Sequence, residues 1–250
     1  MKTRSLLVLA AALHAFGCDD PPPKKNPFEP PAKSTNEPPK LTEPPKPKGP
    51  PELEVKTSEI RVGFDLVLFD RPEGPSRLTT ALAEHRSHLE GKQVTLAADR
   101  KAKPAWVIAL MKELEKLGAT GFLVKTESRT EFPKELALDR QATQREAKPC
   151  AVVAMVLDDR ATAVWQVQGG AALKWPKGFA GPDLSMTAET LEKKGAACKD
   201  SAVLFFQGGE KIEWGLIYDL AASATKLQKH KFEKLVLLEK VPVAGRKVEL

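Results

Sequence analysis

The sequence predicts an α/β (α+β) protein in which two small tandem βαβαβ lobes follow a proline-rich tether. Thirteen of the chain's 21 prolines fall within residues 19–51, a stretch that cannot build a core. From residue 53 onward, stretches with strand and helix periodicity alternate, and the order strand, helix, strand, helix, strand occurs twice. We therefore expect domain 1 at 52–128, a linker at 129–149 and domain 2 at 150–250.

In the first lobe we expect strands at 58–70, 93–98 and 119–127, and helices at 76–91 and 104–118. Pro104 suits the first helical turn and Gly118 suits the position after a helix end, so the helix between them is the clearest in the chain. In the second lobe we expect strands at 150–159, 161–168, 201–207 and 232–241, and helices at 185–198 and 211–228.

The first 17 residues have the layout of a secretory signal peptide. Lys2 and Arg4 precede an apolar run at 5–12 that is too short to be a confident membrane span. Cys18 then stands at the switch from apolar to polar residues, and the stretch AFGC (15–18) resembles a bacterial lipobox. This resemblance implies cleavage before Cys18 and attachment of acyl chains such as palmitate, which would anchor the chain to a membrane. The alternative is an ordinary signal peptide with a chance cysteine.

The tether between the anchor and the first lobe is expected to be disordered. Its mixture of Pro, Lys, Glu and Asn favours solvated polyproline II conformations, and 33 residues could reach on the order of 100 Å. We interpret it as a passive spacer, with a PxxP docking motif as the alternative. The predicted location is the bacterial cell envelope, facing the periplasm, with the inner and outer membranes both open.

Charge and cysteine content restrict the function further. The net charge of +6 comes partly from the leader and the tether, and the remainder has acids and bases interspersed without a basic patch, so we expect no nucleic-acid partner. After Cys18 only Cys150 and Cys198 remain. In an oxidising compartment such a pair favours a disulfide, although two separate buried thiols remain the alternative.

The stretch VTLAADRKAKPAWVIALMKELEKLGATGFLVKTE (94–127) resembles the periplasmic domain of the ExbD/TolR family of biopolymer transport proteins. That family shows an apolar strand ending in Ala-Asp, an aromatic residue, an amphipathic helix ending in Leu-x-x-x-Gly and a further strand. Ala98-Asp99, Trp106, Leu114 and Gly118 fit these positions. The second lobe follows the same order, with Trp214 in the place of Trp106 and Gln207-Gly208 in the place of the aspartate.

The resemblance implies a binding or adaptor protein rather than a proton channel. Family members carry a transmembrane helix with a proton-handling aspartate, and the signal peptide occupies that place here. The partners it implies are ExbB/TolQ-, ExbD- or TonB-like proteins in a proton-motive-force-driven envelope system. A peptidoglycan-binding lipoprotein without a motor partner is the alternative, and a degenerate enzyme is the remaining one.

The candidate partner-binding residues are Asp99, Trp106 and Trp214. Asp99 is either a strand-end contact to a partner or a turn residue, and the two tryptophans are either ligand platforms or core residues. No catalytic, cofactor or metal site is expected: His85 and His88 are interpreted as solvated helix residues, and Asp158-Asp159 as a hairpin turn.

Overall fold

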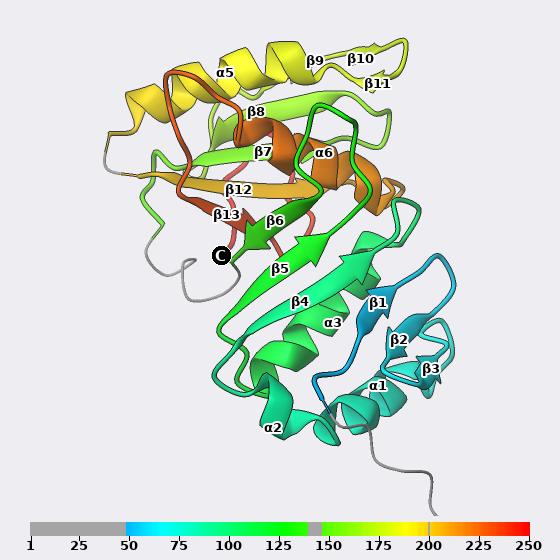
Figure 1. Cartoon of the computed structure of the whole chain (residues 1–250). Coiled ribbons are helices and arrows are strands. Elements are labelled where there is room, and N and C mark those ends of the chain that lie inside the picture. Colours follow the sequence, from blue (N-terminus) through cyan, green and yellow to red (C-terminus); the bar gives the residue numbers. More distant parts are fainter. Residues whose placement is uncertain (1–48, 140–146, 200) are drawn as a thin grey trace, which may run out of the picture. The chain divides into compact units, whose positions relative to one another are not determined.

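The computed structural model describes residues 49–139, 147–199 and 201–250 (Figure 1). Residues 46–250 belong to one compact unit. The predicted signal peptide, Cys18 and nearly all of the tether lie outside the described residues. The part of the chain that the structure describes has the mixed α/β fold that the sequence predicted, and its strands form two mixed sheets.

The first sheet has six strands in the order β3-β2-β1-β4-β5-β6. Strands β1, β4 and β5 run parallel, while β2, β3 and β6 each run antiparallel to a neighbour. The elements of this part are β1 (Leu53–Val55), β2 (Ile60–Val62), β3 (Asp65–Val67), α1 (Gly74–Ala83), α2 (Arg86–Leu89), β4 (Gln93–Ala98), α3 (Pro104–Lys116), β5 (Gly121–Lys125) and β6 (Glu135–Leu138).

The second sheet has five strands in the order β13-β12-β7-β8-β9, and β10 and β11 form a separate hairpin. Strands β7, β12 and β13 run parallel, while β8 and β9 are antiparallel to their neighbours. The elements of this part are β7 (Val152–Val156), β8 (Thr162–Gln166), β9 (Leu173–Trp175), β10 (Lys177–Gly178), β11 (Gly181–Pro182), α5 (Leu184–Ala197), β12 (Val203–Gly208), α6 (Trp214–Ala224) and β13 (Lys234–Leu237).

The chain passes through both sheets in the same way. Each begins with an antiparallel meander of three strands, β1-β2-β3 or β7-β8-β9. The chain then enters α1 or α5 and returns as a strand parallel to the first, β4 or β12. A second helix, α3 or α6, leads to the next parallel strand, β5 or β13. Strand β6 is an addition at the edge of the first sheet.

The two sheets meet edge to edge and share one hydrophobic core. Asp139, directly after β6, forms a parallel bridge with Val236 of β13, and its backbone N–H donates to the carbonyl of Leu235 at 2.8 Å. One continuous core cluster contains Leu110 of α3 together with Ile217 of α6. Figure 1 shows β6 and β13 side by side where the two sheets adjoin.

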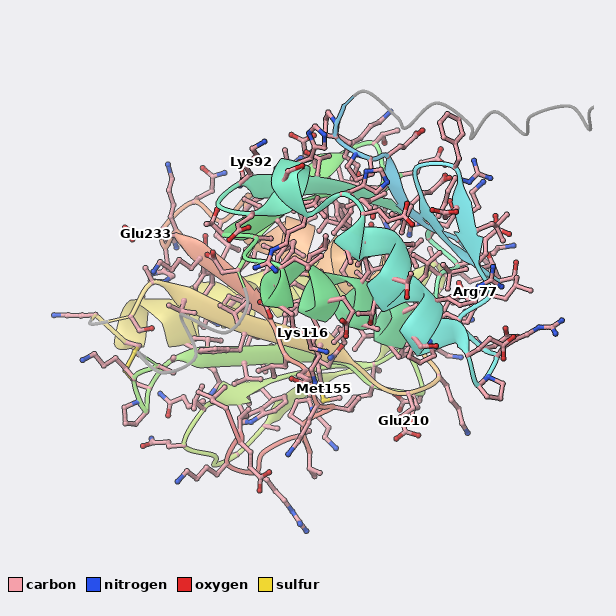
Figure 2. All side chains as sticks on the ribbon, turned by 90° about the horizontal axis from the view of Figure 1, so that it is seen from below. Arg77, Lys92, Lys116, Met155, Glu210 and Glu233 are labelled. Carbon is pink, nitrogen blue, oxygen red and sulfur yellow. A yellow bond between two sulfur atoms is a disulfide. The ribbon has the colours of Figure 1, made fainter. Side chains whose placement is uncertain are left out.

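The two sheets differ in how their faces are covered. In β4, β5 and β6 the apolar residues alternate with exposed or half-exposed ones, so one face packs on helices and the other meets solvent. All five residues of β7 are buried, because the C-terminal segment 244–248 covers the second face of that sheet. Figure 2 shows Met155 of β7 among these strands and Arg77 of α1 reaching outward.

Three expectations about the first half need correction. The expected strand at 58–70 is the hairpin of β2 and β3, because Gly63, with φ of +58°, allows a two-residue turn between Val62 and Asp65. The expected helix at 76–91 is divided into α1 and α2. The expected linker at 129–149 contains β6, whose four residues pair with β5 and bury Leu136 and Leu138.

Candidate functional site

An open hollow lies on the solvent-facing side of the first sheet, at the carboxyl ends of β4 and β5. Its volume is about 440 Å³. Ligands of sheets with parallel strands often bind at this end of the strands. The hollow carries both signs of charge, and Lys125 pairs with Glu135 at 3.3 Å between Nζ and Oε2. The lining residues are Ala97, Ala98, Asp99, Lys125, Thr126, Glu127, Lys134 and Glu135.

Asp99 stands at the rim of this hollow with its backbone fixed and its side chain exposed. Its N–H donates to the carbonyl of Val55 at 2.8 Å, and its carbonyl accepts from Ala102 at 2.9 Å. Its carboxylate has no hydrogen-bond or ion-pair partner among the described residues, and α3 begins after Lys103 without a side-chain cap. The backbone of Asp99 therefore makes the turn that was one of the two predictions, and its carboxylate is exposed to solvent, while a partner contact stays a prediction.

Trp106 and Trp214 are core residues, with 5% and 0% of their surface exposed. Trp106 packs edge to face against Phe69, with Lys103 over its ring at 4.8 Å. Trp214 donates from Nε1 to the hydroxyl of Thr126 at 2.8 Å. The interpretation of these tryptophans as ligand platforms is corrected, because neither ring offers an exposed face on which a partner could stack.

The other predicted positions have plain structural roles. Cys150 and Cys198 form the expected disulfide, with 5.5 Å between their Cα atoms. Asp158 and Asp159 lie in the β7–β8 turn, as expected, where Arg160 adopts a φ of +67°. His85 is only 5% exposed and lies beside the Gly63 turn, so its interpretation as a solvated helix residue is corrected.

A buried ion cluster that sequence reasoning missed joins the two halves of the fold. Asp219 of α6 is 1% exposed and accepts two hydrogen bonds from Arg100, at 3.0 and 2.7 Å. These bonds raise the pKa of the Arg100 guanidinium, while burial acts in the opposite direction. Arg129 adds a second guanidinium, 3.5 Å from the same carboxylate. The sequence signal is an aspartate within the apolar helix WGLIYDLAASA, since a charge there requires a partner.

Close backbone packing accompanies this ion cluster. The N–H of Gly215 donates to the carbonyl of Arg100 at 2.8 Å, and that of Trp214 donates to Ala102 at 3.0 Å. A Cβ atom on Gly215 would lie 2.8 Å from the Cβ of Arg100, so glycine permits the approach. The turn that begins at Asp99 thus packs against the start of α6, and these backbone contacts hold Asp99 in position.

A second hollow, of about 430 Å³, lies where the segment after β5 meets α5 and α6. Apolar side chains including Phe132 and Leu184 line it together with Arg129, Lys226, Glu131 and Asp183, so the two signs of charge are balanced. Within the described ranges no group of three or more His, Cys, Asp or Glu side chains is placed to hold a metal ion. Across those same ranges, no helix combines the length and hydropathy needed to cross a membrane.

Comparison with known proteins assigns no relative. No protein-family model matches the chain, and no curated protein and no solved structure is significantly similar to it.

Proposed function

We propose that this protein is a lipid-anchored, non-enzymatic adaptor of the bacterial cell envelope, built from two tandem ExbD/TolR-like domains. Its periplasmic part would bind a protein of a proton-motive-force-driven system through the open face of the first sheet at Asp99. The anchor is assigned to Cys18, on the lipobox-like sequence alone.

The tandem arrangement is supported by the shared path of the chain. The order meander, helix, strand, helix, strand in both halves agrees with a duplicated domain. Family members place two such domains together as a dimer, and the shared core and the Arg100–Asp219 pair would hold the two copies together within one chain.

The single observation that carries the binding role is the difference between the two sheet faces. The C-terminal segment covers the outer face of the second sheet, whereas β4, β5 and β6 leave theirs open beside the unpaired carboxylate of Asp99. The copy that keeps the family's Ala-Asp motif is therefore also the copy with an accessible surface. Partners in this class are ExbB/TolQ-, ExbD- or TonB-like proteins.

The test is an affinity pull-down of the C-terminally tagged full chain from crosslinked native membranes. We expect motor or TonB-like proteins to co-purify, and Asp99→Asn to reduce their recovery about tenfold, because an anion at the contact is lost. Asp65→Asn is the matched control, since it neutralises another exposed aspartate of the same sheet. Equal recovery with both variants would remove Asp99 from the binding site.

Peptidoglycan binding is the second candidate function. The hollow presents lysines and carboxylates together, which suits the amino and carboxylate groups of cell-wall peptides. Sedimentation of the full chain with purified peptidoglycan separates the two proposals. Co-sedimentation that Asp99→Asn weakens, without any motor protein in the pull-down, would favour the cell-wall role.

A further inference from the structure

A short hairpin beside the edge of the second sheet exposes an aromatic side chain completely. Strands β10 and β11 pair through Lys177 with Pro182 and Gly178 with Gly181, which places Phe179 in the two-residue turn. Phe179 is fully exposed, and Leu173 on the neighbouring edge strand β9 is 46% exposed. In Figure 1 this hairpin extends beyond the end of α5. We call residues 173–182 the aromatic hairpin.

All charges on the aromatic hairpin are positive. Lys174 and Lys177 are both exposed, and residues 173–182 include no acidic side chain. The next residue, Asp183, is already engaged, because its carboxylate accepts the N–H of Met186 at 3.1 Å as the cap of α5. An exposed aromatic ring with flanking lysines is the composition of segments that lie at a membrane–water interface.

The base of the aromatic hairpin is held in place. Strand β9 pairs with β8 from Leu173 to Trp175, and the indole N–H of Trp175 donates to the hydroxyl of Thr190 on α5 at 2.8 Å. These contacts hold the base of the hairpin, and the ring of Phe179 at its turn is fully exposed. Contact with an apolar phase is what would remove this ring from water.

We propose that the aromatic hairpin docks onto an anionic phospholipid bilayer, with Phe179 entering the interface and Lys174 and Lys177 contacting lipid phosphates. This inference rests on the proposed lipid anchor, because the predicted tether at 19–51 would keep the hairpin at a high effective concentration near the membrane. Docking would fix the orientation of the globular part on the bilayer and so direct the surface at Asp99.

A second exposed phenylalanine of the chain, Phe64, can be compared with Phe179, and the comparison favours a lipid partner over an unspecified apolar one. Phe64, in the β2–β3 turn, is 92% exposed, similar to Phe179. It is followed directly by Asp65, whereas the aromatic hairpin carries lysines only. An anionic surface would attract the aromatic hairpin and repel the Phe64 turn, so the two phenylalanines should behave differently on such a bilayer.

The experiment places an environment-sensitive fluorophore on Ala180→Cys in the full mature protein. Vesicles are made either of phosphatidylcholine alone or of an equimolar mixture with phosphatidylglycerol. We expect blue-shifted emission and quenching by doxyl-labelled lipid only with phosphatidylglycerol. Phe179→Ser should lower the ratio of docked to undocked hairpin roughly tenfold or more, and Lys174→Glu with Lys177→Glu should lower it by at least about 25-fold.

Matched variants and a second readout decide between the outcomes. Phe64→Ser should leave the emission unchanged, and an equal loss with Phe64→Ser and Phe179→Ser would overturn the proposal. The proposal would also be overturned if vesicles with phosphatidylglycerol gave no spectral response. The same holds if native membranes, which contain protein, gave a response and the protein-free vesicles gave none. Flotation with phosphatidylcholine vesicles tests the lipid anchor separately, because a chain without an anchor does not float with them. In that case, titration with excess phosphatidylglycerol vesicles tests docking of the aromatic hairpin without help from the anchor.

Discussion

At the scale of single residues, Tyr218 gives the clearest pH dependence because it is the only tyrosine of the chain. Its hydroxyl donates to the carbonyl of Pro133 at 3.2 Å, which connects α6 to the segment before β6. Burial raises the pKa of Tyr218 well above its usual value of 10, and the charges of Glu135 and Asp219 raise it further. The folded protein should therefore keep this phenol protonated at alkaline pH.

We expect the absorbance of tyrosinate in the native protein to stay low above pH 10 until the chain unfolds, and to rise with a midpoint near pH 10 in urea. The folded pKa lies above the unfolded one, so the stability from the neutral phenol is complete below pH 10 and declines as the pH rises further. Spectrophotometric titration checks this, with Tyr218→Phe as the blank. A native titration midpoint near 10 would contradict the prediction.

Residue patterns alone could predict part of the candidate site. The strand-end position of Asp99 follows from the Ala-Asp sequence at the end of an apolar strand, and the structure places its carboxylate in solvent. The burial of Trp106 and Trp214 could not be separated from a ligand role, because an aromatic residue near the start of a helix fits both. Arg100 and Asp219 are 119 positions apart in the chain, so the local sequence around either residue does not predict that they pair.

At the scale of elements, the C-terminal segment acts as the second cover of the second sheet. Val248 is 5% exposed, and its N–H donates to the carbonyl of Val167 at 2.9 Å. The indole of Trp165 donates to the carbonyl of Arg246 at 3.0 Å. This cover explains why β7 could evolve as a run of apolar residues without alternation, since both of its faces are buried.

We expect Val248→Asp to lower the free energy of unfolding by about 3 kcal/mol, because it places a carboxylate against the apolar face that contains Trp165. Val243→Asp is the matched control, since Val243 lies directly before this segment and is 59% exposed. That variant should remain within about 0.5 kcal/mol of the parent chain. Urea denaturation measures both, and equal effects would show that the segment does not act as a cover.

The longer elements were predictable and the short strands were not. The helix expected at 104–118 is α3, and the strand expected at 93–98 is β4, because both have strong local periodicity and clear ends. Strands of three or four residues, such as β1 and β6, are defined by the neighbour with which they pair. The sequence ELAL of β6 has alternation, but it is too short to be distinguished from a linker before the pairing with β5 is known.

At the scale of the whole molecule, the sequence indicates two lobes and the structure joins them into one unit. The joining contacts are a shared core, the bridge from Asp139 to Val236 and the hydrogen bond from Trp214 to Thr126. None of them follows from periodicity, because each connects residues far apart in the chain. The domain boundary predicted from the sequence therefore marks where the second sheet begins. It does not show that both sheets share one core.

These contacts predict that both halves unfold in one cooperative transition. In urea, far-UV circular dichroism and tryptophan fluorescence should give the same midpoint, since Trp106, Trp165 and Trp214 report on different parts of residues 46–250. Arg100→Met should lower the free energy of unfolding by about 2 kcal/mol, because Asp219 then stays buried with only Arg129 nearby and Arg100 itself is partly solvated.

Arg77→Met serves as the control, because Arg77 is exposed on α1 and its side chain has no ion-pair partner within the described residues. It should change the free energy of unfolding by less than about 0.5 kcal/mol. If the parent chain shows two transitions, or if Arg100→Met lowers only one of them, the halves are independent domains. A single transition that Arg100→Met moves as a whole would mean that a contact between the halves stabilises both of them.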